Sequence, residues 1–173
     1  DVWEKNRTCI VYLHPNSSSR LDVVNSYVIQ LAAFCRCAVC GIDLSGSGMS
    51  EGEYISLGWH ETEDVRCVVE DLLFLGIRRC GLAFCVAAVA QPFCASPPTC
   101  LLLLDAIARL VLFGRSMGAV TAAMFAGAYG HLLSGVLSGM VLDSPFTCFE
   151  ELALRQVANG AIKVPQFASR QVL

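Results

Sequence analysis

The chain has 173 residues, of which 55% are hydrophobic and 16% are charged, which suits one domain with a well-buried core and excludes a disordered chain. Its 12 basic and 15 acidic side chains give a formal net charge of −3. Because nucleic-acid binding needs a concentrated basic surface, this balance excludes that class of partner.

The first predicted elements are a strand, a helix and a second strand. Residues 8–13 form an apolar and β-branched run that ends at His14, which is typical of a buried strand meeting a loop. Apolar side chains then recur at helical spacing over residues 20–34, and residues 37–42 form a second strand. The Gly- and Ser-rich residues 44–52 predict a loop at the carboxyl end of that strand.

The later elements repeat this alternation. Residues 59–75 carry an apolar stripe with acidic residues in the first turn, which predicts a helix. A strand at 109–113, a helix at 119–128, a strand at 138–142 and a short helix at 149–159 follow. These strands are too apolar for a sheet with one face in water. We therefore predict an α/β fold, with a mostly parallel sheet covered by helices on both faces.

The connection before residue 109 is unusually long, because α/β units typically need only two to six residues there. We interpret residues 78–107 as an insertion within a single domain that spans residues 1–173. Two origins stay open: untranslated sequence read into the coding frame, or an ordinary lineage-specific loop or cap. Residues 80–104 carry no charge, and the stretch is long enough to suggest a membrane span. Pro92, Pro97 and Pro98 argue against a continuous helix there.

The ten cysteines lie mostly in apolar runs, where a reduced cysteine behaves as a small hydrophobic side chain. We therefore expect a reducing, cytoplasmic setting, and no signal-peptide pattern follows Asp1. Cys35, Cys37 and Cys40 cluster in the sequence. No second Cys/His pair follows them at zinc-site spacing, so core packing is the favoured interpretation and we expect no metal.

Gly114, Ser116 and Gly118 form a G-x-S-x-G pentapeptide between the third predicted strand and its helix. A strand, this turn and a helix in that order are typical of a nucleophile elbow, which holds a serine hydroxyl at a strained corner. The glycines leave room for strand and helix to pack closely. A chance match is the alternative for the pentapeptide alone, and the flanking strand and helix favour the elbow.

Polar residues follow four of the predicted strands: His14, Asp43, Ser116 and Asp143. Reactive groups gather at the carboxyl ends of the strands in such sheets. These four side chains therefore outline a candidate site at one edge of the sheet.

Four segments resemble, in this order, the α/β-hydrolase fold in its serine aminopeptidase-like branch. They are H-P-N-S-S-S-R at 14–20, D-L-S-G-S-G at 43–48, G-R-S-M-G at 114–118 and V-L-D-S-P-F at 141–146. The resemblance covers roughly residues 8–75 and 109–173. It implies a serine hydrolase that cleaves a small-molecule or peptide ester, thioester or amide through an acyl-enzyme on Ser116, without a cofactor.

The resemblance also implies an oxyanion hole made by the main-chain amides of Asn16 and Met117. Pro15 stands where the family usually has glycine. Proline has no N–H, but the amide of Asn16 remains available, so we expect a stiffer hole that keeps its donors.

The resemblance further implies an acid and a histidine on strands after the one that ends at Asp143, and neither strand is found in this chain. None of the three histidines stands where the base is implied. His14 is interpreted as a structural hydrogen-bonding residue and His60 begins a helix. His131 lies one helix length, about 20 Å, beyond Ser116.

The acids have competing interpretations. Asp143 stands where some α/β-hydrolases carry their catalytic acid, but the favoured role is structural, bonding the amides of the 144–146 turn. Asp43 is expected to order the glycine loop that follows it.

We therefore expect a serine hydrolase core that lacks its C-terminal strands and turns over little by itself, because a base is missing. The alternative is a non-catalytic, hydrolase-like interaction module that self-associates through its truncated sheet. A membrane-attached hydrolase is a third possibility that depends only on residues 80–104.

Overall fold

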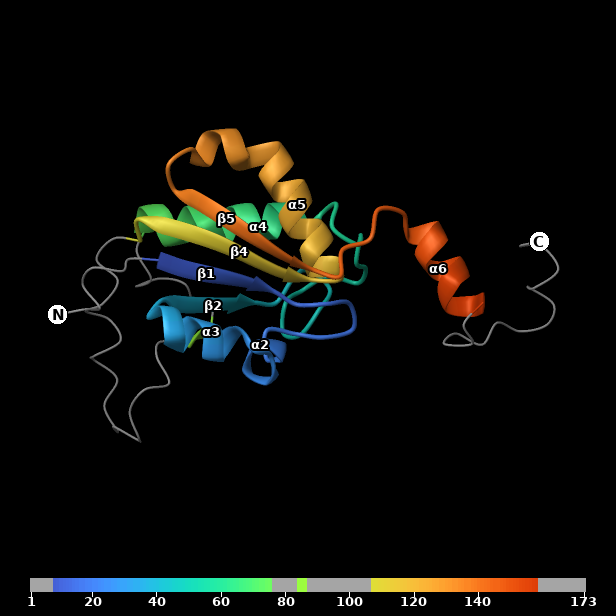
Figure 1. The fold of residues 1–173 in the computed structure, drawn as a ribbon. Helices are drawn as coiled ribbons and strands as arrows, with labels where there is room; N and C mark the ends of the chain where they lie inside the picture. Colours follow the sequence, from blue (N-terminus) through green and yellow to red (C-terminus); the bar gives the residue numbers. More distant parts are fainter. Residues whose placement is uncertain (1–7, 76–83, 87–106, 159–173) are drawn as a thin grey trace.

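The computed structural model describes residues 8–75, 84–86 and 107–158. Its sheet has the strand order β3-β2-β1-β4-β5 (Figure 1). The parallel strands are β1 (Thr8–Leu13), β2 (Ala38–Ile42), β4 (Arg109–Arg115) and β5 (Leu137–Asp143). The short β3 (Phe84–Val86) pairs antiparallel with β2.

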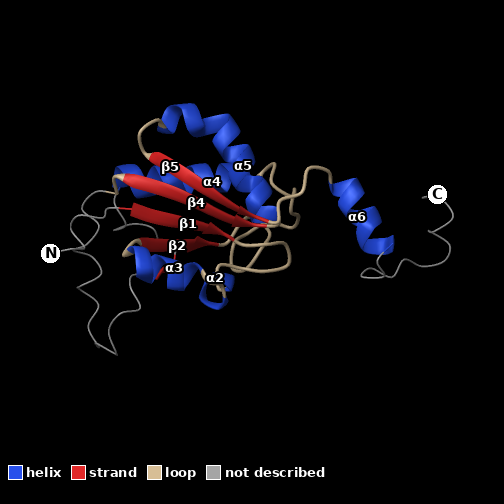
Figure 2. Ribbon diagram, in the orientation of Figure 1, coloured by secondary structure: helices blue, strands red, loops and turns tan. Residues whose placement is uncertain are grey.

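Helices cover both faces of this sheet (Figures 1 and 2). One face carries α2 (Asp22–Asn25) and α3 (Val28–Cys35). The other carries α4 (Glu61–Glu70), which continues into a π-helical turn, and α5 (Met117–Tyr129). The last helix, α6 (Phe149–Ala158), follows β5 and projects away from the sheet in Figure 1. The predicted α/β class is confirmed.

Side chains that alternate along the strands build two cores. Ile10, Tyr12 and Phe113 pack with α2 and α3, and the rings of Tyr12 and Phe113 stack with centroids 5.8 Å apart. Val11 and Leu112 pack with α4 and α5 on the opposite face. Because both faces are buried, the central strands need apolar residues at every position, which explains their unbroken apolar runs.

The prediction of one continuous helix over residues 20–34 is wrong, because the chain forms α2 and α3 with a break at Ser26. The Ser26 hydroxyl donates to the carbonyl oxygen of Val23 at 2.7 Å and accepts the N–H of Val28 at 3.3 Å. A serine hydroxyl that bonds nearby main-chain groups competes with the helical ladder, so the periodic apolar pattern continues across two shorter helices.

The strand β3 was not predicted and lies within residues 78–107. The remainder of that segment, apart from residue 107, is outside the described residues, so the proposed insertion stays a prediction. The uncharged stretch 80–104 is likewise described only at 84–86. Among the helices that the structure describes, none has both the length and the apolar character needed to cross a bilayer.

Candidate active site

The strand order creates a point of divergence between β1 and β4. From β1 the chain passes through α2 and α3 to β2, whereas from β4 it passes through α5 to β5 on the opposite side. The two connections leave on opposite faces of the sheet, which makes the carboxyl ends of these strands a topological switch point. In open α/β sheets this is the usual location of a ligand site, and Ser116 follows β4 there.

Ser116 occupies a strained corner. Its φ of 51° and ψ of −112° lie outside the regions that non-glycine residues ordinarily adopt. The Ser116 N–H donates to the carbonyl oxygen of Asp143 at 2.8 Å, and its own carbonyl accepts the N–H groups of Ala119 and Val120. These bonds hold the strained conformation between β5 and α5, as expected for strain that is retained at a functional position.

The flanking glycines are sterically required. A Cβ on Gly114 would lie 2.2 Å from the carbonyl oxygen of Gly118. A Cβ on Gly118 would lie 2.1 Å from the carbonyl oxygen of Leu13 and 2.9 Å from that of His14. The expected close packing of strand and helix is observed, and Gly118 also lets the first turn of α5 contact the end of β1.

The same close approach brings together the two segments that hold the expected oxyanion donors. Asn16 is exposed on the loop after β1, and Met117 is the first residue of α5. The first N–H groups of a helix have no intrahelical acceptor, so the amide of Met117 has no partner within α5, although the residue is completely buried. The hydroxyl of Ser116 itself forms no hydrogen bond with any described residue.

His14 is completely buried, and both ring nitrogens are occupied. Nε2 accepts the N–H of Leu44 at 3.2 Å, so the proton of the neutral ring is on Nδ1, which donates to the carbonyl oxygen of Pro15 at 2.8 Å. His14 therefore connects the loop after β1 to the end of β2. This geometry favours the structural interpretation over proton transfer.

The other two histidines are exposed and occupy helix ends. His60 directly precedes α4. His131 lies in the 3₁₀ turn after α5. The 13 residues of α5 separate His131 from Ser116 by about 20 Å. Neither hydrogen bonds to Ser116, so none of the three histidines is arranged as its base.

Asp43 is a structural acid, as the sequence favours. Its carboxylate accepts the main-chain N–H and the Nη1 of Arg20 at 2.6 and 2.8 Å, and the N–H of Met49 at 3.0 Å. A Cβ on Gly48 would lie 2.3 Å from this carboxylate. Asp43 thus fixes both the loop after β1 and the β2–α4 loop, which we define as residues 44–60.

Two acids of α4 complete this arrangement, although the sequence indicated them only as acids of a first helical turn. Asp64 accepts the N–H and the hydroxyl of Ser45 at 2.7 and 2.8 Å. Glu61 is fully buried and accepts the N–H of Ser56 at 2.6 Å, the Ser56 hydroxyl, and the N–H of Gly58 at 2.8 Å. Three carboxylates therefore hold the β2–α4 loop through its main chain.

Burial alone would raise the pKa of Glu61, but the hydrogen bonds from Ser56 and Gly58 outweigh burial and lower its pKa. The bond from Gly58, three residues earlier, resembles the reciprocal half of a capping box. The three-residue spacing between Gly58 and Glu61 was the one sequence indication that Glu61 bonds the main chain of the loop. Otherwise Glu61 is an ordinary acid in a first helical turn.

Asp143 is half-buried and takes part in a looser ion cluster. Its carboxylate lies 3.6 Å from Nε of Arg115 and accepts the hydroxyl of Ser144 at 2.9 Å. Arg115 also faces Asp22 of α2 at 3.8 Å, and Asp22 accepts the hydroxyl of Tyr12 at 2.5 Å. Burial is the largest cause that raises the pKa of Tyr12, and the Asp22 carboxylate raises it further. Asp143 thus bonds the 144–146 turn through the Ser144 hydroxyl.

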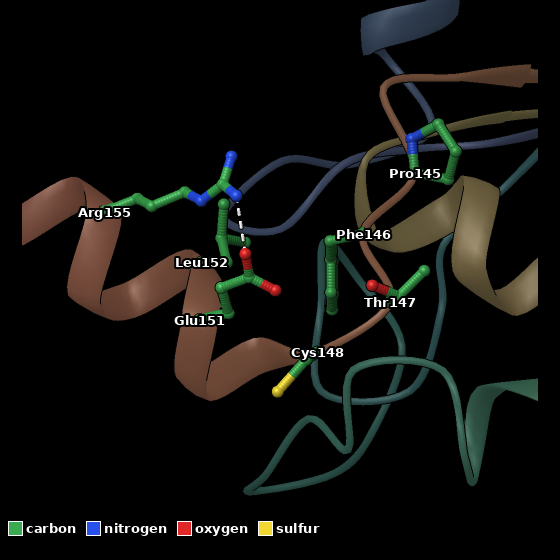
Figure 3. Close-up of a pocket in the computed structure, with 7 residues that line it drawn as sticks. All are labelled: Pro145, Phe146, Thr147, Cys148, Glu151, Leu152 and Arg155. Carbon is green, nitrogen blue, oxygen red and sulfur yellow. Dashed lines mark hydrogen bonds and ion pairs between the residues drawn. The ribbon is translucent and has the colours of Figure 1, made fainter.

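Two hollows occur away from the elbow. One, of about 290 Å³, lies between α6 and the segment that precedes it and contains the ion pair of Glu151 with Arg155 (Figure 3). The other, of about 390 Å³, borders α3 and the sheet and is lined in part by Cys35 and Cys37. Neither is lined by Ser116. The described residues contain no group of three or more side chains arranged to hold a metal ion.

Comparison of the chain with protein-family models, with curated proteins and with solved structures finds no match. Functional inference therefore depends on the geometry of the site itself.

Proposed function

We propose that the chain is a serine hydrolase core of the α/β-hydrolase fold that forms an acyl-enzyme on Ser116. The observation that carries this proposal is the backbone of Ser116, held at φ 51° between two glycines that have no room for a Cβ. A serine kept in a strained strand-to-helix corner at a topological switch point is the arrangement that presents a nucleophile to a carbonyl carbon.

In the proposed reaction the hydroxyl oxygen of Ser116 attacks the carbonyl carbon of an ester, thioester or amide. The negative charge that develops on the carbonyl oxygen is stabilised by the amides of Asn16 and Met117. The leaving group departs with a proton, and water then hydrolyses the acyl-serine. The helix dipole of α5, whose positive end is at Met117, favours the same charge.

The missing component is a base for the Ser116 proton. His14 has both nitrogens occupied, and His60 and His131 form no bond with Ser116. Loss of one triad member commonly lowers turnover by several orders of magnitude, so we expect slow acylation by this polypeptide. Without a base that titrates near neutral pH, the rate rises steadily with pH as hydroxide increases.

A fluorophosphonate probe tests the proposal. We expect slow labelling that continues to rise above pH 8, and no labelling of the Ser116→Ala variant. Labelling of wild type that survives Ser116→Ala contradicts the assignment of the nucleophile. Labelling as fast as that of a hydrolase with a complete triad, with a plateau near pH 7, contradicts the statement that the base is missing.

A second candidate is a non-catalytic module that associates through β5, the last strand of the described sheet. Met140, Val141 and Leu142 are 42, 39 and 37% exposed, and no charged side chain interrupts residues 137–142. An apolar edge strand without a protective charge favours pairing with another strand. Sedimentation of wild type and Val141→Lys tests it: a self-associated wild type and a dissociated variant support the module, and a monomeric wild type rejects it.

A further inference from the structure

The β2–α4 loop exposes three large apolar side chains although its backbone is firmly held. Met49, Tyr54 and Trp59 are 77, 85 and 69% exposed. Asp43, Asp64 and Glu61 each bond to main-chain groups of this loop. A rigid backbone that presents apolar side chains to solvent is typical of a recognition surface, because ordering costs little on binding.

Trp59 directly follows a glycine that contacts α5, the helix that begins after Ser116. Its neighbour Gly58 is buried, and a Cβ there would lie 3.2 Å from Cγ1 of Val120 and 3.4 Å from the amide nitrogen of Thr121. The nearest atom to a Cβ on Gly58 is Sδ of Met124 at 3.1 Å, so Gly58 contacts α5 between Val120 and Met124, about 6 to 12 Å along the axis beyond the corner.

The backbone around Trp59 is fixed on both sides. The N–H of Gly58 donates to Glu61, and the N–H of His60 donates to the Ser56 hydroxyl at 2.6 Å. The hydroxyl of Thr62 donates to the carbonyl oxygen of Trp59 itself. The backbone of Trp59 is therefore held next to a residue that contacts α5, and its side chain is largely exposed.

The charges of the β2–α4 loop limit what this surface accepts. Its ionised side chains are Glu51 and Glu53, both exposed, and the segment 44–60 contains no Lys or Arg. Two carboxylates without a basic partner on the loop disfavour an anionic chain and an anionic lipid surface. A neutral, apolar group is the chemistry that fits an exposed indole in this setting.

We propose that Trp59 is a specificity-determining residue that contacts a neutral, apolar acyl chain of the substrate attached at Ser116. This inference rests on the proposed hydrolase function and adds its substrate class. Esters with long, uncharged acyl chains are then preferred over short or carboxylated ones, because the chain buries apolar surface against the indole.

The test uses methylboronic and octylboronic acid, whose boron bonds to a serine oxygen while the hydroxyl proton leaves to solvent. Trp3→Phe removes the only other tryptophan, so the emission reports Trp59 alone. In this background we expect octylboronic acid to bind about tenfold more tightly than methylboronic acid and to shift the emission to the blue. Calorimetry gives the affinities.

Trp59→Ala is expected to remove the preference for the longer chain, and Trp59→Phe to retain most of it. Phe34→Ala is the matched control, because Phe34 is 87% exposed on α3 at the opposite face of the sheet, and it keeps the tenfold preference. Thermal unfolding of each variant verifies that it is folded. An unchanged preference in Trp59→Ala, or bound octylboronic acid without an emission shift, overturns the inference.

The same experiment separates this inference from the function on which it rests. If Ser116→Ala binds the boronic acids as well as wild type does, or if wild type binds neither, the proposed hydrolase function fails and the substrate class fails with it. If the emission instead shifts with phosphatidylcholine vesicles and not with octylboronic acid, Trp59 contacts a lipid surface and the acyl-chain assignment is rejected.

Discussion

The polar residues near β2 and those near β4, at the carboxyl edge of the sheet, have different roles. On the β2 side, Asp43, Asp64 and Glu61 each accept main-chain N–H groups and so serve to hold a loop. On the β4 side, the hydroxyl of Ser116 has no partner among the described residues while its backbone is strained. Polar groups whose hydrogen bonds are satisfied stabilise the fold, whereas a strained group without a hydrogen-bond partner is the candidate catalytic residue.

The steric requirement at the elbow gives the largest expected effect. Gly118→Ala places a Cβ 2.1 Å from the carbonyl oxygen of Leu13, so we expect the free energy of unfolding to fall by more than about 3 kcal/mol. Urea unfolding measures the change.

Gly127→Ala is the matched control in the same helix, because nothing lies within 4 Å of its added Cβ. This substitution should stabilise the protein by up to about 1 kcal/mol through helix propensity. Equal effects at the two glycines would contradict the close contact between α5 and β1.

Glu61→Gln tests whether the carboxylates near β2 hold the β2–α4 loop. The amide nitrogen that replaces one carboxylate oxygen cannot accept an N–H, so the bond from Ser56 or the bond from Gly58 is lost, and we expect a loss of about 2 kcal/mol in urea unfolding at pH 7. Glu70→Gln, at a half-exposed ion pair with Arg66, should change stability by less than about 0.5 kcal/mol.

The pH dependence of Glu61 follows from its lowered pKa. A carboxyl whose folded pKa lies below its unfolded value, about 4.3, contributes stability that is complete above the unfolded value. This stability is lost as pH falls through the folded pKa. Acid titrations of wild type and Glu61→Gln should therefore converge below that pKa, and a constant difference down to pH 2 would contradict this account.

Strain at the elbow predicts a gain in stability. Ser116→Gly should raise the free energy of unfolding by about 1 kcal/mol, because glycine adopts the φ of 51° without a steric penalty. Ser134→Gly is the control, since Ser134 has an ordinary φ of −55°, and we expect it to lower stability by about 0.5 kcal/mol. Equal losses in both variants would mean that Ser116 is not strained.

The smallest effect is expected at His131. It is exposed at the far end of α5, so His131→Ala should change neither stability by more than about 0.5 kcal/mol nor the rate of fluorophosphonate labelling. A large loss of labelling would identify His131 as the base and reverse our assignment.

The sequence predicts the parts of this fold that depend on local chemistry. The apolar runs of β1 and β4 and the G-x-S-x-G turn indicate both the parallel sheet and the corner at Ser116, because local sterics determine them. The break at Ser26 was missed, since the hydroxyl bonds that cause it leave the apolar periodicity intact.

The non-local contacts could not be predicted in the same way. Glu61 reads from the sequence as an acid in a first helical turn, and its complete burial depends on how the β2–α4 loop folds back over it. The order β2-β1-β4-β5, which puts Ser116 at the topological switch point, likewise follows from packing of distant segments. The ion pair of Asp143 with Arg115 was likewise not indicated, because the two residues lie on neighbouring strands far apart in the sequence.

Peptide mapping after fluorophosphonate treatment tests the central claim most directly, because Ser116 and Ser144, two of the described serines with positive φ, directly follow neighbouring strands. Ser116 has an unpartnered hydroxyl, whereas the hydroxyl of Ser144, at φ 56°, donates to Asp143. The account predicts a phosphonyl adduct on the peptide that carries Ser116 and none on the peptide that carries Ser144. An adduct on Ser144, or equal modification of both peptides, would contradict it.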